Sequence, residues 1–201
     1  MIGWLYDLLG RGVERGEMGQ RRRGLLSELE GEVLEIGAGT GFNLPHYERA
    51  SRVVAVEPNA SMAKQLQKRI AEAAVPVELR AGSAESLPFA DESFDTAVLT
   101  FVLCSVKDPA TALREVRRVL RPGGRLVVLE HVRGDGNLAT WQGRLTPIHR
   151  KVAGNCHLDR DTRSALAEAG FETQEVEDVR IPGSHPLVRS GIQGVAIKIS
   201  S

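Results

Sequence analysis

The sequence contains few of the residues on which several classes of protein depend. Only two of its 201 residues are cysteine, Cys104 and Cys156, so it has neither a disulfide framework nor a paired-cysteine zinc motif. Aromatic residues make up 4%, which argues against a protein that stacks single-stranded nucleic acid on aromatic side chains. Lys+Arg 26 balances Asp+Glu 26, so the basic footprint of a nucleic-acid-binding domain is also missing. No apolar run of about 18 residues occurs, and we expect no transmembrane helix.

The N-terminal stretch is short of positive charge as well. No lysine or arginine precedes its apolar residues and Asp7 interrupts them, which is unlike a secretory signal peptide. We therefore expect a cytoplasmic protein in which residues 1–30 form a helical lid, with Trp4, Tyr6 and Met18 folding over the ligand site. The alternative is a helix that lies on a membrane surface through Ile2, Trp4, Leu5, Leu8 and Leu9.

What the sequence does contain is an alternation of strand-like and helix-like segments. Apolar runs typical of buried strands occur at 32–37, 52–58, 77–82, 94–102 and 125–132. Helical patterns occupy 61–73 and 109–120; the second begins at the capping pair Asp108-Pro109 and is stopped by Pro122-Gly123-Gly124. The chain is long enough for one domain, 1–201. The pattern predicts an α/β fold, a parallel sheet wound on both faces by helices.

The C-terminal third departs from this alternation. Asp161 can cap a short helix that ends near Gly170, and strand-like runs follow at 171–179 and 194–199. The loop between these runs is too short for a crossover helix, so we expect the two strands to be antiparallel. Residues 133–160 show no regular spacing, and we interpret them as an insertion that forms a substrate lid.

A glycine-rich turn follows the first strand and carries the main functional signal. It reads Glu35-x-Gly37-x-Gly39-x-Gly41, and glycines at such a turn let the backbone approach a ligand. Glu57 ends the second strand at the spacing expected of a carboxylate that accepts hydrogen bonds from ribose hydroxyls. A nicotinamide dinucleotide would instead require a small residue where Phe42 stands, because the third glycine comes one residue early.

Glu35 points to a ligand without phosphates. A carboxylate is badly placed beside a pyrophosphate but well placed beside an ammonium group. S-adenosylmethionine (SAM) combines an adenosine, whose ribose suits Glu57, with a cationic amino-acid tail, whose ammonium group suits Glu35. In the turn after the third strand, Ala84 can offer its backbone N–H to the adenine, and Ser83 or Glu85 can accept from the exocyclic amine.

Five ordered motifs resemble class I SAM-dependent methyltransferases: EIGAGTG (35–41), VEPN (56–59), GSAESLPF (82–89), FDTAV (94–98) and REVRRVLRPGG (114–124). The resemblance implies a three-layer αβα fold with a seven-stranded, mostly parallel sheet and a reversed last strand. It also implies that SAM contacts Glu35, Gly37, Gly39, Gly41, Glu57, Asn59, Ala84 and Glu85; we complete this set with Ala38, Pro58, Met62, Ser83, Thr100 and Phe101. Ubiquinone-type relatives usually carry aspartate at the position of Ser83.

The second half resembles a narrower family. TFVLCSVKDP (100–109), EHVRG (130–134), WQGRLTP (141–147) and CHLDRDT (156–162) are similar to methyltransferase-like proteins that include thiol S-methyltransferases. The resemblance implies a small-molecule methyl acceptor, favours a thiol, and gives no reason to expect a nucleic acid or stable membrane attachment. Alternatives are C-, O- or N-methylation of a quinone, phenol or lipid head group, a SAM-binding module without turnover, and, last, a nicotinamide dehydrogenase.

Few residues are candidates for acid–base catalysis. His131 at the end of the fifth strand could be a general base, and His157 or Asp159 could be a base or orient one. A thiol needs such a base least, because part of it is already thiolate at neutral pH. We expect no metal, because the Cys and His spacing does not match a zinc motif; a zinc site formed by Cys104, His131, Cys156 and His157 is the alternative. We interpret Arg21, Arg22 and Arg23 as a solvated helix face, with a site for acidic substrates or lipid head groups as the alternative.

Overall fold

A computed structural model of the chain describes residues 8, 10, 12 and 14–199. Its elements, in chain order, are α2 (Glu17–Leu26), β1 (Gly31–Ile36), the 3-10 turn η1 (Leu44–His46), β2 (Ala50–Val56), α3 (Ala60–Ile70), β3 (Val77–Arg80), β4 (Phe94–Thr100), α4 (Pro109–Val119), β5 (Leu120–His131), α5 (Gly136–Val152), α6 (Thr162–Glu168), β6 (Phe171–Arg180), the 3-10 turn η2 (Pro186–Val188) and β7 (Ser190–Lys198).

The strands form one seven-stranded sheet in the order β3-β2-β1-β4-β5-β7-β6. The pairs among β1 to β5 are parallel, whereas β7 is antiparallel to both of its neighbours. This arrangement confirms the expected mostly parallel sheet with a reversed last strand. The strand order changes direction between β1 and β4, and ligands of open α/β sheets bind at such a switch point, beyond the carboxyl ends of the strands.

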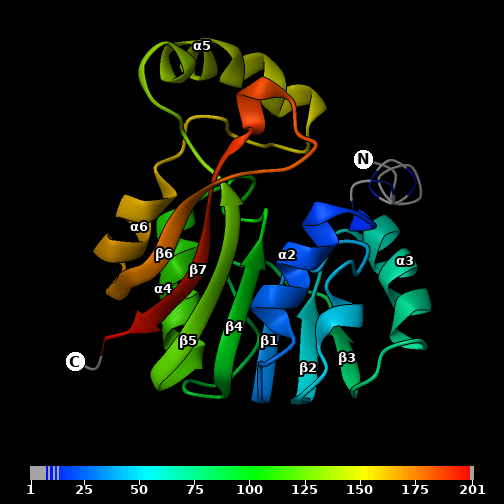
Figure 1. Cartoon of the computed structure of the whole chain (residues 1–201). Coiled ribbons are helices and arrows are strands. Elements are labelled where there is room, and N and C mark those ends of the chain that lie inside the picture. Colours follow the sequence, from blue (N-terminus) through cyan, green and yellow to red (C-terminus); the bar gives the residue numbers. More distant parts are fainter. Residues whose placement is uncertain (1–7, 9, 11, 13, 200–201) are drawn as a thin grey trace.

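Helices cover both faces of the sheet (Figure 1). On one face Leu113 of α4 and Leu166 of α6 join strand residues in the larger core cluster. On the other, Leu26 of α2 and Leu66 of α3 pack with strand residues and with Tyr47, whose side chain is fully buried. The fold is therefore the three-layer arrangement that the sequence predicts.

Three helices begin at a capping residue, and the sequence predicts two of these caps, Asp108 and Asp161. Asp108 accepts a hydrogen bond from the Ala110 N–H and is followed by Pro109 at the first helical position. Asp161 accepts from the Ser164 N–H at the start of α6. Asn59 accepts from the second and third N–H groups of α3 and fixes that helix directly after β2. Each cap satisfies donors that the helix itself cannot pair.

One expectation for local structure is wrong in detail. Helix α4 ends at Val119, and Pro122-Gly123-Gly124 lies inside the irregular start of β5 instead of stopping the helix. The glycine-rich turn after β1 is followed by the three-residue turn η1. The segment 133–160, interpreted as an insertion, contains a helix of 17 residues, α5.

Helix α5 lies beyond the carboxyl ends of β4 and β5, away from the body of the sheet (Figure 1). Its buried side chains are Gln142 and Thr146, which are polar, so no apolar helical period marks it. Gln142 accepts from the Gly134 N–H at 2.8 Å and donates to the Leu187 carbonyl at 2.9 Å. Hydrogen bonds to neighbouring loops thus help to fix α5 in place.

Part of the N-terminal lid prediction lies outside the described residues, including Trp4, Tyr6 and most of the apolar stretch. Leu8 is exposed, whereas Met18 is buried against Leu129 and Ile181. Within the part of the chain that the structure describes, no helix has the length and apolarity needed to cross a bilayer.

Candidate active site

A cavity of about 580 Å³ opens at the switch point of the sheet, beyond the carboxyl ends of β1, β2 and β4. Eleven predicted SAM-binding residues line it: Gly37, Gly39, Glu57, Pro58, Asn59, Met62, Ser83, Ala84, Glu85, Thr100 and Phe101. A smaller cavity of about 30 Å³ shares Gly37, Gly39 and Thr100 with the first and adds Glu35 and Ala38. The fold therefore brings together 13 of the 14 residues that the sequence assigns to the ligand.

Gly41 lines neither cavity and has a packing role. It has φ +88°, and a Cβ atom there would come within 2.6 Å of the Leu66 side chain. Gly37 is different because it lies at the cavity wall: its φ is +65°, and a Cβ atom would meet Val102 at 2.7 Å. A side chain at either position would strain the turn, and at Gly37 it would also push against the loop after β4.

Glu57 is held in place by the glycine turn. Its two carboxylate oxygens accept one backbone N–H each, from Gly39 and from Asn59, both at 2.8 Å. Burial raises the pKa of Glu57, although these two hydrogen bonds act in the opposite direction. A carboxylate oxygen has two lone pairs, so each oxygen can accept a further hydrogen bond from a ligand in the cavity.

Glu35 is buried at the end of β1 with only part of its hydrogen-bonding capacity used. Its Oε1 atom accepts from the Asn43 amide at 3.0 Å, whereas Oε2 has no hydrogen-bond partner among the described residues. Burial raises the pKa of Glu35 to about 7, against the lowering effects of the buried Tyr47 hydroxyl, Asn43 and Arg22. A buried acceptor of this kind is costly unless a donor reaches it, and an ammonium group would be such a donor.

The arginine cluster is not uniformly solvated, which corrects the sequence interpretation. Arg22 is buried and donates to Glu14, to Asn43 at 2.6 Å and to Thr100 at 3.1 Å. Arg22 lies four residues from Met18 and from Leu26, which are both buried on the same helix. This helical spacing indicates that Arg22 lies on the buried face of α2. Arg22 lines the small cavity beside Glu35 and places a positive charge there.

We expect Arg22→Ala to lower the free energy of unfolding by about 3 kcal/mol, the low end for breaking a buried ion pair. The substitution leaves Glu14 without its partner and Asn43 and Thr100 without a shared donor. Urea unfolding monitored by circular dichroism measures the change. Arg23→Ala is the matched control, because the Arg23 side chain is 66% exposed, and we expect a change within about 0.5 kcal/mol. Equal losses in the two variants would contradict a structural role for the Arg22 network.

The turn after β3 is fixed to the loop after β4. The Ser83 hydroxyl donates to Glu85, whose other oxygen accepts from the Lys107 N–H at 2.8 Å. Burial raises the pKa of Glu85, but the hydrogen bonds from Ser83 and Lys107 outweigh it and leave the value lowered. Ala84 is buried at the cavity wall. Glu85 therefore shapes the turn in addition to facing the cavity.

None of the three predicted catalytic residues lines either cavity. His131 is buried at the end of β5, with its Nε2 atom 2.9 Å from the Cys156 Sγ atom. His157 is half-buried in the loop after α5, and burial lowers its pKa. Asp159 lies two residues further along the same loop. Their assignment as general bases stays a prediction.

The sequence reading did not place several residues of the cavity wall. Ile36, Gly82, Val102, Val106 and Lys107 come from strand ends and turns next to the predicted residues, and Ala153 and Gly154 follow α5. The first group could have been found from its position after strands. Ala153 and Gly154 belong to no recognisable sequence motif, and only the tertiary structure shows that they line the cavity.

Comparison with known proteins agrees with this geometry. Residues 34–128 match the family described as "Methyltransferase domain". Thiol S-methyltransferase TMT1A of Homo sapiens is 36% identical over 195 residues, covering 90% of this chain and 80% of TMT1A. Phosphatidylethanolamine N-methyltransferase of Cereibacter sphaeroides is 38% identical over 148 residues, covering 72% of each chain. A solved structure from Thermotoga maritima, described as a SAM-dependent methyltransferase and possible histamine N-methyltransferase, superposes with a TM-score of 0.69 at 27% identity and covers 99% of this chain and 98% of its own.

The fold, the cavity and these matches define a class I SAM-dependent methyltransferase that acts on a small molecule. This confirms the expected fold class, enzyme class and cofactor. More narrowly, the chain belongs to the methyltransferase family that includes the thiol S-methyltransferases TMT1A and TMT1B.

Proposed function

We propose that this enzyme transfers the methyl group of SAM to the sulfur of a small thiol. The observation that carries the proposal is the cavity wall itself: among its described residues the titratable side chains are Glu57, Glu85 and Lys107, and no histidine faces the cavity. Glu57 and Glu85 are both engaged in hydrogen bonds that fix the local backbone. A hydroxyl or carbon acceptor depends on a base more than a thiol does. The similarity to thiol S-methyltransferases over 90% of the chain supports the same acceptor class.

SAM fits the donors and acceptors of the two cavities. We infer that Glu57 accepts from the ribose hydroxyls, that the turn at Ser83 and Ala84 receives the adenine, and that the unpaired Oε2 of Glu35 accepts from the amino-acid ammonium. Arg22, next to Glu35, supplies a positive charge toward the carboxylate of the same ligand. SAM supplies an electrophilic methyl group, and the protein positions the acceptor in line with it, which alone can contribute about 7–11 kcal/mol to catalysis.

We infer that the methyl acceptor lies against Ala153 and Gly154, which follow α5, and against Ser105 and Val106, which follow β4, because all four line the cavity and none belongs to the predicted SAM-binding set. We propose that 133–160 acts as a substrate lid, because Ala153 and Gly154 belong to this segment. The lid role of the N-terminal segment 1–30 and a cytoplasmic location stay predictions; within this segment Leu26 of α2 packs into the core on one face of the sheet.

Two other acceptor classes have their own support. The match to a phosphatidylethanolamine N-methyltransferase covers 72% of this chain and supports an amine, such as a lipid head group. A ubiquinone/menaquinone biosynthesis C-methyltransferase of Marinomonas is 34% identical, covers 73% of this chain and supports a quinol ring to the same extent. The same cavity could hold any of these classes of acceptor. An activity assay, and not the fold, therefore distinguishes the acceptor classes.

We expect purified enzyme to bind SAM and to label alkyl thiols when incubated with methyl-labelled SAM. Binding at 10 μM affinity should add about 2.7 kcal/mol to the free energy of unfolding at 1 mM ligand, visible as a thermal shift that NAD does not produce. The acceptors compared are an alkyl thiol, ethanolamine, a phenol and a quinol. Label found in ethanolamine or the phenol but not in the thiol would overturn the thiol proposal, and SAM binding without label in any acceptor would favour a binding module.

A further inference from the structure

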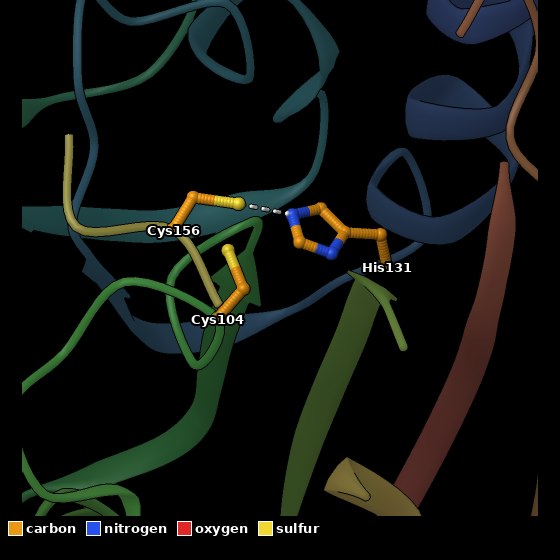
Figure 2. Close-up of side chains that lie close together, drawn as sticks. All are labelled: Cys104, His131 and Cys156. Carbon is orange, nitrogen blue, oxygen red and sulfur yellow. Dashed lines mark hydrogen bonds between the residues drawn. The ribbon is translucent and has the colours of Figure 1, made fainter. Parts of the chain in front are cut away.

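Two cysteines and one histidine point toward one another in the interior of the fold (Figure 2). Cys104 follows β4, His131 ends β5, and Cys156 lies in the loop after α5. Their two sulfur atoms and one ring nitrogen all lie within 4.8 Å of one another. The three residues are 2%, 7% and 8% exposed, and they are far apart in the sequence, so no spacing motif could reveal them.

The backbone around this Cys–His–Cys cluster (Cys104, His131 and Cys156) is held by bonds that do not involve the three side chains. The His157 N–H donates to the Cys104 carbonyl at 2.8 Å, and the Asn155 amide donates to the Ser105 carbonyl at 2.8 Å. Arg160 donates to the carbonyl of Leu103 and to that of Val106. The two cysteine loops are therefore pre-positioned against each other, as a binding site requires.

The methyl-transfer site does not account for the cluster. None of the three residues lines either cavity. The cluster is nevertheless next to the larger cavity, because Phe101 lines that cavity and its ring stacks on the His131 ring with the ring centroids 6.3 Å apart. Buried thiols pack as small apolar groups, but a buried imidazole needs partners, and the Nδ1 atom of His131 has no hydrogen-bond partner among the described residues, so packing alone does not explain His131.

We propose that Cys104, His131 and Cys156 bind one zinc ion. Zn–S bonds of about 2.3 Å and Zn–N bonds of about 2.0 Å place tetrahedral ligand atoms about 3.5–3.8 Å apart. The observed separations run from 2.9 Å, between Cys156 Sγ and His131 Nε2, to at most 4.8 Å. Small side-chain rotations thus suffice to reach zinc geometry.

The ligand set selects this class of metal. Thiolate and imidazole favour zinc and other soft cations over magnesium or calcium, which take oxygen ligands. Two thiolates and a neutral imidazole around a divalent cation sum to zero charge, so the complex can be buried without an unpaired ion. Three protein ligands leave the fourth tetrahedral position open, which is the pattern of reactive and not of closed structural zinc sites.

The test is metal binding by the full chain, purified under reducing conditions, stripped with a chelator and dialysed. Titration with ZnCl₂ against a chromophoric chelator should give one zinc per chain, with release of protons from the thiols. Co²⁺ in place of zinc should produce the thiolate-to-cobalt charge-transfer absorption and the intense visible bands of a tetrahedral site. We expect Cys104→Ser, Cys156→Ser and His131→Gln each to weaken zinc binding at least 100-fold.

His157→Gln is the matched control, since this histidine is next to Cys156 in sequence but outside the cluster, and its zinc affinity should equal that of the unaltered chain. If a variant fails to fold, zinc protection of Cys104 and Cys156 from alkylation in the unaltered chain, located by mass spectrometry, tests the same point. The proposal is overturned by the absence of a charge-transfer band, by zinc binding that the cysteine substitutions leave unchanged, or by a reduced chain that takes up no zinc. None of these readouts depends on the methyl acceptor.

Discussion

Replacing Glu57 by alanine should weaken SAM binding by about 100-fold or more. Each hydrogen bond to a charged acceptor contributes about 1.5–3 kcal/mol, so losing two ribose contacts costs about 3 kcal/mol at the low end. A tenfold change corresponds to about 1.4 kcal/mol. The substitution also leaves the N–H groups of Gly39 and Asn59 without their acceptor, which loosens the glycine turn that forms the cavity wall.

Isothermal titration calorimetry with SAM and with its demethylated product measures this effect. Glu72→Ala is the control, because Glu72 is an exposed glutamate just beyond α3, and we expect its affinity to be unchanged. The SAM affinity of Glu57→Gln should fall between those of Glu57→Ala and Glu72→Ala, since the amide keeps one acceptor oxygen but loses the charge. An unchanged affinity in Glu57→Ala would show that the ribose is held by other residues.

The sequence predicts most of the residues that line the two cavities, because the signals for them are local. Gly37, Glu35 and Glu57 each lie at the end of a strand, and the parallel sheet brings strand ends to one edge without any further information. Asp108 and Asp161 are equally local, and both caps are confirmed.

Features that depend on distant contacts are not predicted. Helix α5 has polar side chains, Gln142 and Thr146, at its buried positions, so hydrophobic periodicity cannot find it. Arg22 is buried only because Glu14, Asn43 and Thr100 converge on it from three separate segments. A run of charged residues is normally exposed to solvent. The burial of Arg22 depends on partners that are distant in the sequence, so the run itself does not predict it.

Glu35 should give the apo enzyme a distinctive dependence on pH. Its carboxyl titrates near pH 4.5 when unfolded and near 7 when folded. Between these values the folded state binds more protons than the unfolded state, so stability is fully present below about pH 4.5 and is lost as the pH rises through about 7. The loss is on the order of 3 kcal/mol, since each pKa unit corresponds to about 1.36 kcal/mol.

Glu35→Gln should therefore have two effects of opposite sign. At pH 8 the apo variant should be more stable than the unaltered enzyme by up to roughly 3 kcal/mol, because the amide carries no charge to bury. Its affinity for SAM should fall, because the ammonium loses its buried counter-charge, and loss of one partner of such a pair costs about 2–5 kcal/mol. Urea unfolding and calorimetry on the same preparations measure the two effects.

The pH profile of SAM binding separates this role from a general loss of structure. In the unaltered enzyme the affinity should rise about tenfold per unit of pH below 7 and level off above it, as the carboxylate forms. Measurements between about pH 5.5 and 7.5 keep most of the ligand's own amine protonated, since α-amino groups titrate near 7.7–8.0. Glu35→Gln should bind weakly and with a flat profile. A Glu35→Gln variant that is more stable, yet keeps the full affinity for SAM and the full pH dependence of that affinity, would show that another group receives the ammonium. Misfolding could not explain this result, because misfolding does not raise stability, and the titrating charge would have to belong to another residue.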